Sequence, residues 1–284
     1  MIKKIQGFIE LTRLDKPVGI YLLFWPSFIG LLLGAIDRGS IEFKNYFILI
    51  IGTVLVRSCG CIINDINDYK FDRLVSRTKN RPLASGKMGM TEAWLYFTLL
   101  ATLSLCLLFF VPLYTIYASL VVAVFIMIYP LTKRFLKAPQ FFLGITFGSG
   151  TIISFSLVSS DFSLSLLILF IGTVLWIISF DTIYAFEDIA DDLKIGINST
   201  PILWGDQALN ISKYLHLAFY VSLALIGFIN KFSSFFLLVL IILLGLYIHQ
   251  RRLINNDQYL DAFKFNNWIG MFASIGFVIE AFLI

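Results

Sequence analysis

The sequence YFILIIGTVLVRSCGCIINDINDYKFD, residues 46–72, joins a long apolar run to a cluster of carboxylates. The run at 46–64 has the length that a helix needs to cross a bilayer, about 20 residues. A helix turns about 100° per residue, so Asp65, Asp68 and Asp72 would fall within roughly 60° of one another. The stretch therefore predicts a membrane helix that brings three carboxylates to one membrane surface.

The chain as a whole has the composition of an integral membrane protein. Of its 284 residues, 58% are hydrophobic and 14% are charged, and the mean hydropathy is +0.86. Soluble domains average about 25% charged residues, so this composition excludes an ordinary soluble fold. The formal net charge of +4 is too small to indicate nucleic-acid binding. The basic, amphipathic start of the chain lacks the features of a cleavable signal peptide, so we expect the first apolar run to be retained.

Continuous apolar runs predict an all-α, multi-pass membrane bundle of nine transmembrane helices. The predicted helices cover residues 17–36, 46–64, 92–111, 113–130, 139–158, 163–186, 208–230, 232–250 and 265–284. Two long polar connections lie at about 65–91 and 187–207. We interpret residues 1–284 as a single membrane-embedded domain.

Lys and Arg are distributed unevenly between the two sides of this bundle. With the N-terminus in the cytoplasm, one side receives both long polar connections and the basic turn at 130–138, and with them most of the basic residues. The other side receives only Arg38, Lys44 and Lys231. Because cytoplasmic loops carry an excess of Lys and Arg, we expect the N-terminus and both polar connections to be cytoplasmic.

An internal repeat relates the two halves of the chain. The pentapeptide IGTVL at 51–55 recurs at 171–175. At the same offset of 120 residues, one aspartate pair matches another, Asp68 and Asp72 with Asp188 and Asp192. The offset spans four predicted helices, so both copies run in the same direction, and we predict two parallel four-helix repeats plus one helix. Parallel repeats also occur in transporters, so the repeat alone does not indicate an enzyme.

A second acidic motif, DTIYAFEDIADD at residues 181–192, follows the sixth apolar run. Asp181, Asp188 and Asp192 share a helix face by the same arithmetic, and Tyr184 lies on that face too. Asp181 belongs to the apolar run, where an ionisable residue is costly and is a functional candidate by default. Either motif alone could be a solvated helix end. Two motifs in matching register on one membrane side favour a shared site.

The chemistry of both motifs suits a hard metal ion. Three carboxylates on one helix face repel one another unless cations intervene. Oxygen ligands without Cys or His suit Mg²⁺, which typically takes one or two protein carboxylates and completes its octahedron with water and substrate phosphate. The candidate ligands from this pattern are Asp65, Asp68, Asp72, Asp188 and Asp192. The three cysteines, Cys59, Cys61 and Cys106, lie in apolar runs and are interpreted as packing residues.

Basic residues accompany both motifs. Arg81 follows the first motif, Lys133 and Arg134 end the fourth predicted helix, and Lys194 follows the second motif. They could hold the oxygens of a metal-bound diphosphate, although the cytoplasmic excess of Lys and Arg would place some of them here by itself. Arg57 differs because it lies in mid-span and needs an anionic partner. That partner is either a ligand carboxylate or one of the motif aspartates.

With these motifs in this order, the sequence resembles the UbiA superfamily of intramembrane prenyltransferases, most closely the 4-hydroxybenzoate polyprenyltransferase branch. The resemblance covers nearly the whole chain. It is carried by Arg13–Pro17, Trp25-Pro26, Gly60-Cys61, Asn64–Asp72, Arg77–Gly86, Tyr129–Arg134, Asp181–Asp192 and Lys194–Thr200. A lone pair of spaced aspartates would be a weak signal, whereas the ordered set is specific.

The resemblance implies a central cavity that opens to the cytoplasmic face and laterally to lipid. It implies Mg²⁺ ions that bridge a diphosphate to Asn64, Asp68 and Asp72 and to Asp188 and Asp192. The implied reaction, in ubiquinone biosynthesis at a bacterial inner membrane, moves a polyprenyl group from polyprenyl diphosphate to the ring carbon ortho to the hydroxyl of 4-hydroxybenzoate. The two substrates and the lipid bilayer are then the expected partners, with no obligatory protein partner.

This chemistry assigns expected roles to the remaining residues. The diphosphate would be bound by Arg81, Tyr129, Lys133, Arg134 and Lys194, and Lys133 and Arg134 would also stabilise the charge that builds as it leaves. Arg57 would hold the acceptor carboxylate, since a guanidinium and a carboxylate form a two-pronged pair, with Asp181 and Tyr184 nearby. Asp181 or Asp191 would take up the ring proton.

Two other classes of function fit the sequence less well. A sibling prenyltransferase would use the same motifs with another aromatic or quinone-precursor acceptor. A transporter for divalent cations or organic anions would fit mid-span charges and parallel repeats. The carboxylates, however, cluster at one membrane side rather than along a pathway, which favours the enzyme.

Overall fold

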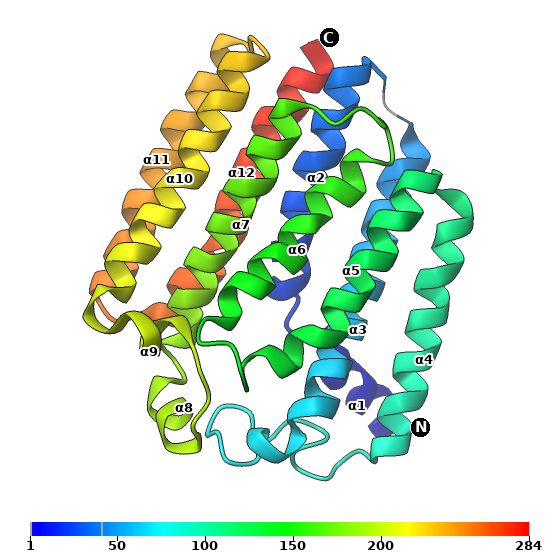
Figure 1. Cartoon of the computed structure of the whole chain (residues 1–284), viewed down its shortest axis with the longest axis vertical. Coiled ribbons are helices and arrows are strands. Elements are labelled where there is room, and N and C mark those ends of the chain that lie inside the picture. Colours follow the sequence, from blue (N-terminus) through cyan, green and yellow to red (C-terminus); the bar gives the residue numbers. More distant parts are fainter. Residues whose placement is uncertain (1, 41, 284) are drawn as a thin grey trace.

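The computed structural model describes residues 2–40 and 42–283, and within those ranges it contains helices and no strands (Figure 1). The long helices are α2 (Val18–Arg38), α3 (Phe43–Asp72), α4 (Met90–Leu107), α5 (Leu113–Thr132), α6 (Pro139–Phe155), α7 (Leu164–Ala185), α10 (Ala208–Ile229), α11 (Ser234–Asn255) and α12 (Tyr259–Leu283). The short helices α1 (Ile2–Thr12), α8 (Ile189–Ile195) and α9 (Thr200–Trp204) lie at one end of the bundle. Two 3₁₀ turns occur at Leu108–Phe110 and Gly205–Gln207.

The all-α membrane fold is confirmed, and each of the nine predicted ranges coincides with one long helix. Eight spans in the described ranges are long and apolar enough to cross a bilayer, with mean hydropathies of 1.2 to 2.2. The remaining long helix, α6, has 17 residues, at the lower limit for a span. The count of nine transmembrane helices therefore stays a prediction.

Several helix ends differ from the predicted boundaries. α3 continues to Asp72, whereas its apolar run ends at residue 64. α11 reaches Asn255 and α12 begins at Tyr259, so the polar connection between them is short. The predicted connection 187–207 contains α8 and α9. Apolar runs stop at the first charged residue, but a helix continues through charged residues when cations neutralise them, as they do on α3.

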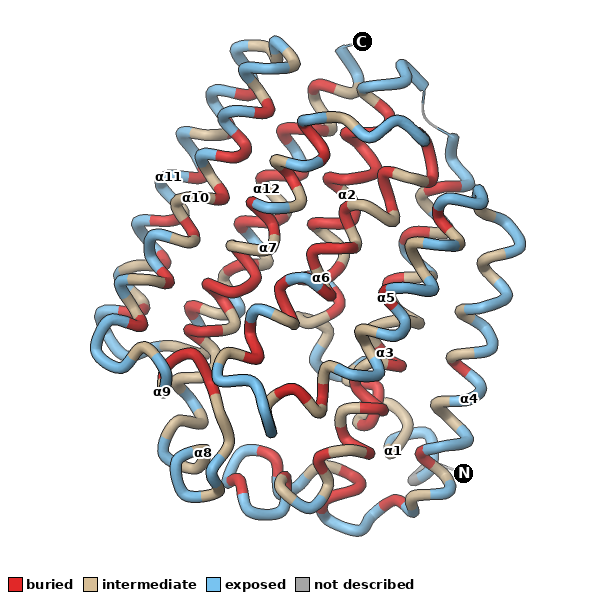
Figure 2. The backbone as a smooth tube through the Cα atoms, in the orientation of Figure 1, coloured by how far each residue is buried: buried red, intermediate tan, exposed pale blue. Residues whose placement is uncertain are grey.

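The core lies between α2, α6, α7 and α12, whose inward faces are buried in Figure 2. Trp176 of α7 is fully buried and stacks on Phe219 of α10 with ring centroids 4.6 Å apart. Its indole N–H donates to Asn266 Oδ1 of α12 at 2.8 Å. α4 and the outer faces of α10 and α11 carry exposed large apolar residues, as expected for surfaces that face lipid.

Small residues allow the central helices to approach closely, as is common in membrane bundles. A Cβ atom placed on Gly30 of α2 would lie 2.4 Å from the carbonyl oxygen of Thr151 of α6. Only glycine fits this crossing. The α2–α6 contact therefore fixes one wall of the bundle interior.

α3 and α7 run in the same direction, so the two acidic motifs reach the same end of the bundle (Figure 1). We call this end, where α1, α8 and the connection 73–89 also lie, the motif end. The direction agrees with the proposed repeat. The pairing of the two halves as structural repeats stays a prediction.

Candidate active site

A cavity of about 1090 Å³ runs through the bundle interior from the motif end. It is lined by residues of α2 to α7 and α12, and along α3 it extends from Ile48 to Asp65, roughly 25 Å at 1.5 Å per residue. Polar side chains line its motif end, and its far end is lined mainly by apolar residues such as Leu105, Val111 and Leu157. A smaller cavity of about 160 Å³ lies between the two motifs.

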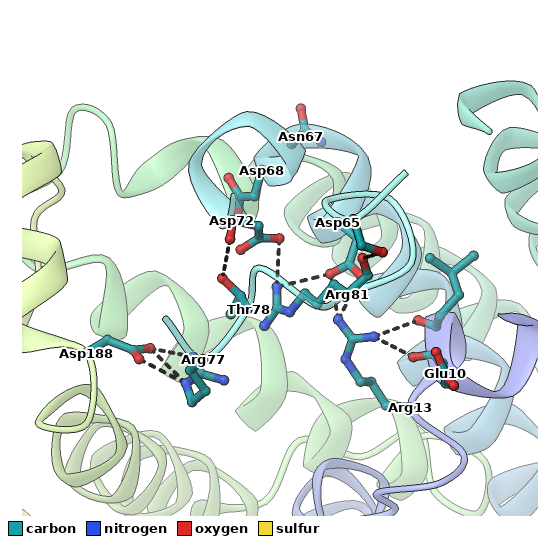
Figure 3. Close-up of polar contacts among 12 residues, drawn as sticks. Glu10, Arg13, Asp65, Asn67, Asp68, Asp72, Arg77, Thr78, Arg81 and Asp188 are labelled. Atoms are coloured by element: carbon teal, nitrogen blue, oxygen red, sulfur yellow. Dashed lines mark hydrogen bonds and ion pairs between the residues drawn. The ribbon is translucent and has the colours of Figure 1, made fainter. Parts of the chain in front are cut away.

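The first motif presents three aspartates on one face of α3, as its spacing predicts. Asp65, Asp68 and Asp72 have relative exposures of 1%, 0% and 6%. A buried carboxylate is stable only when it is paired or hydrogen-bonded. Each of the three has cationic partners, which Figure 3 shows for Asp65 and Asp72.

Asp65 is bound by two guanidinium groups. Arg13, which follows α1, donates from Nη2 to both carboxylate oxygens at 2.7 Å. Arg81, in the connection after α3, donates to Oδ1 at 3.1 Å. Both oxygens are therefore occupied, and the pair with Arg13 holds the N-terminal segment against α3.

Asp68 is the most deeply buried of the three. Lys133, which follows α5, donates from Nζ to its Oδ2 at 2.5 Å, and Arg134 Nη2 lies 3.8 Å from its Oδ1. Among the described residues, Oδ1 has no hydrogen-bond partner. A buried carboxylate oxygen without a donor is an available ligand for a cation.

Asp72 at the end of α3 is held by the connection that follows it. Arg81 donates from Nη1 to Asp72 Oδ2 at 3.0 Å, so this one guanidinium joins Asp65 and Asp72. The hydroxyl of Thr78 donates to the Asp72 carbonyl at 3.0 Å. The connection 73–89 thus folds back over the first motif.

Arg77 links this connection to the second motif. Its guanidinium donates to both carboxylate oxygens of Asp188, as Figure 3 shows, and lies 4.9 Å over the ring of Tyr184. The backbone N–H of Ser76 donates to Asp191 Oδ2 at 2.9 Å. The two motifs, 120 residues apart in sequence, are therefore joined directly through residues 76 and 77.

The carboxylates of the second motif differ in their surroundings. The hydrogen bond from the Ser76 N–H lowers the pKa of Asp191. Burial and the neighbouring carboxylate of Asp188 raise the pKa of Asp192 to about 6. Asp192 lines the smaller cavity with Asp188, Asn64 and Lys133. A cation bound among these groups would oppose the shift at Asp192.

Four of the predicted residues lie where the two cavities meet. Asn64, Tyr129, Asp181 and Tyr184 line both of them. Arg57 lines the large cavity seven residues before Asn64 on α3, further from the motif end. Its guanidinium lies 5.4 Å from the centroid of the Phe147 ring. Among the described residues, Arg57 forms no ion pair, and its Nε has no hydrogen-bond partner. Its charge is available to an anionic ligand in the cavity.

Two predicted diphosphate-binding residues lie away from the cavities. Lys194 of α8 is 75% exposed and forms an ion pair with Asp191 at 3.6 Å. Arg134 is 40% exposed and donates to the carbonyl of Asn67 at 2.7 Å. Neither lines a cavity, whereas Arg81 lines the large cavity and Lys133 the small one.

Arg13 and Arg77 bind motif aspartates, a role that the sequence analysis assigned to neither of them. Both lie in segments that carried the family resemblance, Arg13–Pro17 and Arg77–Gly86. Their partners are 52 and 111 residues away, so no local pattern could reveal the pairs. Each carboxylate that becomes buried needs a cationic or hydrogen-bonding partner. The number of aspartates in the two motifs therefore predicts more basic partners than the sequence analysis assigned.

The side chains of the two motifs have the ligand chemistry that a magnesium ion prefers. The candidate ligand atoms are all oxygens, and Asp68 Oδ1 is buried without a donor. In the described part of the chain, no three His, Cys, Asp or Glu side chains converge on one point. Because Mg²⁺ usually needs only one or two protein carboxylates beside substrate oxygens, separate contributions from the two motifs suffice.

Comparison with known proteins places this arrangement in a family. Residues 23–276 match the UbiA prenyltransferase family, and this range includes both acidic motifs and Arg57. The chain belongs to the UbiA prenyltransferase family. The resemblance inferred from the sequence is therefore confirmed.

Relatives within the UbiA family match the chain over its full length. A protein from Coxiella burnetii named 4-hydroxybenzoate octaprenyltransferase is 36% identical over 280 residues, covering 98% of this chain and 97% of the relative. A protein of the same name from Colwellia psychrerythraea is 37% identical and covers 99% of both chains. These relatives agree with the branch predicted from the sequence.

A solved UbiA structure has the same fold. The apo structure of a UbiA homologue from Aeropyrum pernix K1 superposes with a TM-score of 0.80 at 24% identity, covering 92% of this chain and 97% of that one. A UbiA homologue from Archaeoglobus fulgidus, solved with GPP and Mg²⁺ bound, gives a TM-score of 0.75 at 17% identity with 98% of both chains covered. At these identities the likeness concerns the fold alone.

Proposed function

We propose that this protein transfers a polyprenyl group from polyprenyl diphosphate to 4-hydroxybenzoate, at the ring carbon ortho to the hydroxyl, in ubiquinone biosynthesis. The observation that carries the proposal is the large cavity, apolar at its far end and bounded at the motif end by two paired carboxylate clusters. A polyprenyl diphosphate matches this cavity, because it has a charged diphosphate at one end and a long apolar tail at the other. The full-length relatives named 4-hydroxybenzoate octaprenyltransferase support the acceptor.

The carboxylates would hold magnesium against the diphosphate. The proposed ligands are Asn64, Asp68, Asp72, Asp188 and Asp192, and the UbiA homologue solved with GPP and Mg²⁺ supports this chemistry. When bound, magnesium supplies positive charge to the leaving diphosphate oxygens. We do not assign Asp65 as a ligand, because two guanidinium groups, those of Arg13 and Arg81, already bind it, whereas Asp188 is bound by Arg77 alone.

The basic residues around the motifs would bind the diphosphate directly. Lys133, Arg77 and Arg81 now neutralise motif aspartates at the cavity edge. When metal satisfies those aspartates, the same cations can donate to diphosphate oxygens. Preorganised positive charge of this kind stabilises a leaving group as its charge develops. Arg134 and Lys194 lie further out and would act at longer range.

The acceptor would lie between Arg57 and the motif end. Arg57 has no carboxylate within ion-pair distance among the described residues, so it can form a two-pronged pair with the carboxylate of 4-hydroxybenzoate. Tyr129, Tyr184 and Asp181 line the path from there to the motifs. Asp181 is our candidate for the group that takes up the ring proton. Asp191 fits that role less well, because it binds Ser76 and lines neither cavity.

The apolar part of the cavity would exclude water from the reacting centre. As the diphosphate leaves, the prenyl group becomes an allylic cation that water would trap. Side chains such as Leu22, Ile126 and Phe147 line this region and would hold the ring and the prenyl carbon in contact.

The proposal is tested by an assay in membranes or detergent with radiolabelled 4-hydroxybenzoate, a polyprenyl diphosphate and Mg²⁺, with and without EDTA. We expect label in the lipid-soluble fraction that depends on Mg²⁺. A folded protein that prenylates another aromatic acid but not this one would be a sibling prenyltransferase. If the folded protein transfers no prenyl group but moves cations or organic anions across vesicle membranes, the protein is a transporter and the proposed enzymatic function is wrong.

A further inference from the structure

A second group of buried and partly buried polar side chains lies between α10 and α11, away from the proposed active site. It comprises His216 and Tyr220 of α10 and Tyr247, Gln250 and Arg251 of α11. We call it the α10–α11 polar cluster. None of its side chains lines either cavity. α10 and α11 lie side by side at one edge of the bundle (Figure 1).

The members of this cluster contact one another through their rings. The His216 ring lies 5.0 Å from that of Tyr220 and 5.4 Å from that of Tyr247. The guanidinium of Arg251 lies 5.1 Å over the Tyr247 ring. Gln250 donates to the carbonyl of Ala262 on α12 at 2.9 Å, which fixes the cluster against the rest of the bundle.

Many polar atoms of the cluster have no hydrogen-bond partner among the described residues. They are both ring nitrogens of His216, the hydroxyls of Tyr220 and Tyr247, Oε1 of Gln250, and Nε and Nη2 of Arg251. His216 is completely buried. In a membrane each such group costs several kcal/mol if it stays unsatisfied. Their number at one place points to a ligand that binds beside them.

The chemistry of the unpartnered atoms indicates an anion. Arg251 is partly exposed, and a guanidinium can bind two oxygens of a phosphate or carboxylate side by side. In the described part of the chain, Arg251 has no carboxylate within ion-pair distance. The tyrosine hydroxyls and His216 add further donors. A donor-rich group around an unpaired cation suits an anion with several oxygens better than water alone.

The position of the cluster indicates where the anion comes from. Arg251 lies one turn before the end of α11, and His216 lies eight residues into α10, about 12 Å along its axis. Both helix ends are at the motif end. On the same two helices, Tyr214, Leu244 and Ile248 are exposed large apolar residues. The exposed basic residues Lys213 and Arg252 lie one turn before His216 and next to Arg251 in the sequence. Basic sites between helices near a membrane surface bind anionic lipid head groups.

We propose that the α10–α11 polar cluster binds the phosphate group of an anionic membrane lipid, with Arg251 as the charged contact. The acyl chains then lie along the exposed apolar faces of α10 and α11. This site is separate from the proposed active site and does not depend on the reaction assigned to it.

Lipid binding to the purified protein tests the proposal, with native mass spectrometry to count bound lipids and a titration to give Kd. The probes are phosphatidylglycerol, phosphatidylcholine with the same acyl chains, and inorganic phosphate. We expect preferential binding of phosphatidylglycerol. Arg251→Ala is expected to weaken it roughly ten- to a hundred-fold, the usual effect of losing a charged hydrogen-bonding partner. The neighbouring, exposed Arg252→Ala is the matched control and is expected to bind as the unaltered protein does.

Tyr247→Phe removes only a hydroxyl and is expected to fold, so the proposal can still be tested if Arg251→Ala does not fold. Tyr247→Phe is expected to weaken lipid binding several-fold, whereas Tyr214→Phe, an exposed tyrosine on α10, is not. Lipid binding by Tyr247→Phe or Arg251→Ala as tight as by the unaltered protein would overturn the proposal. So would equal losses in Arg251→Ala and Arg252→Ala, which indicate nonspecific attraction. Competition by inorganic phosphate as effective as by phosphatidylglycerol would assign the site to a soluble anion instead of a lipid.

Discussion

Every aspartate of the first motif already has a cationic partner from a distant part of the chain. Arg13 reaches Asp65, Arg81 reaches Asp65 and Asp72, and Lys133 reaches Asp68. These pairs explain how α3 can bury three carboxylates within two turns. They also separate the aspartates into those whose oxygens are all occupied and those with an available oxygen.

Asp68 is expected to be essential for turnover, since it combines complete burial with an oxygen that has no donor. Asp68→Asn keeps the size of the side chain but removes the charge that would hold metal, so we expect activity to fall at least about a hundred-fold, the scale of one lost transition-state charge contact. Asp188→Asn should act in the same way. The control is Asp261→Asn, an exposed carboxylate outside both motifs. Full activity in folded Asp68→Asn or Asp188→Asn would contradict the two-motif metal site.

Arg57 is expected to determine acceptor affinity. Arg57→Ala should raise the KM for 4-hydroxybenzoate by roughly ten-fold or more, because a charged two-pronged pair is lost, while the KM for polyprenyl diphosphate changes little. Steady-state kinetics with each substrate varied in turn gives the answer. An equal rise in both KM values would remove Arg57 from the acceptor site.

Asp65 is expected to stabilise the fold rather than hold metal. Breaking a buried ion pair costs up to about 3 kcal/mol when the remaining charge loses its counter-charge. Arg81 also binds Asp65, so Arg13→Ala and Asp65→Asn should each lower the melting temperature by less than this limit implies. Their double variant should lose little more than either, since the two residues act as one unit. Lys4→Ala on α1 is the surface control. Strictly additive losses, or unchanged stability, would show that the pair is not a structural link.

At the scale of helices, some features of the structure could be predicted from the sequence and others could not. The apolar runs located all nine long helices, because a membrane span must be continuous and apolar. The shared face of Asp65, Asp68 and Asp72 also followed from helical periodicity. The eight extra residues of α3 did not, since its continuation depends on Arg13, Arg81 and Lys133, which are remote in sequence. Residue types predicted the carboxylates of the candidate site, whereas only the fold revealed which cation pairs with each.

The α2–α6 crossing at Gly30 is expected to tolerate no side chain. Gly30→Ala would place a methyl group 2.4 Å from a backbone carbonyl that cannot move alone, and overpacking of this kind costs about 1–3 kcal/mol. We expect a lower melting temperature in detergent than for Gly245→Ala, where the structure places nothing within 4 Å of the new methyl group. Equal melting temperatures for the two variants would contradict this close packing.

At the scale of the whole molecule, the distribution of Lys and Arg gives the bundle a direction. Lys79 lies in the connection at the motif end, and Lys231 lies in the turn between α10 and α11 at the opposite end. We propose that the motif end faces the cytoplasm of a bacterial inner membrane, so that both substrates meet at the cytoplasmic surface.

Thiol labelling tests this orientation. In a variant without Cys59, Cys61 and Cys106, Lys231→Cys should react with a membrane-impermeant maleimide added to intact spheroplasts, because its side chain is exposed. Lys79→Cys should react only after the membrane is permeabilised. The reverse pattern would invert the topology and place the active site on the other side.

The ion pairs at the motif end mean that the aspartates are already neutralised by basic side chains and do not form a cluster of free negative charge. Arg13, Arg77, Arg81 and Lys133 balance Asp65, Asp68, Asp72 and Asp188, so the cluster is close to electrically neutral before any ligand arrives. A metal ion bound to Asp68, Asp72 and Asp188 would compete with Lys133, Arg81 and Arg77 and leave these cations without full counter-charges. Magnesium together with diphosphate supplies a new partner to each side of every broken pair. Metal and diphosphate are therefore expected to enter and leave as one salt, and neither should be retained tightly without the other.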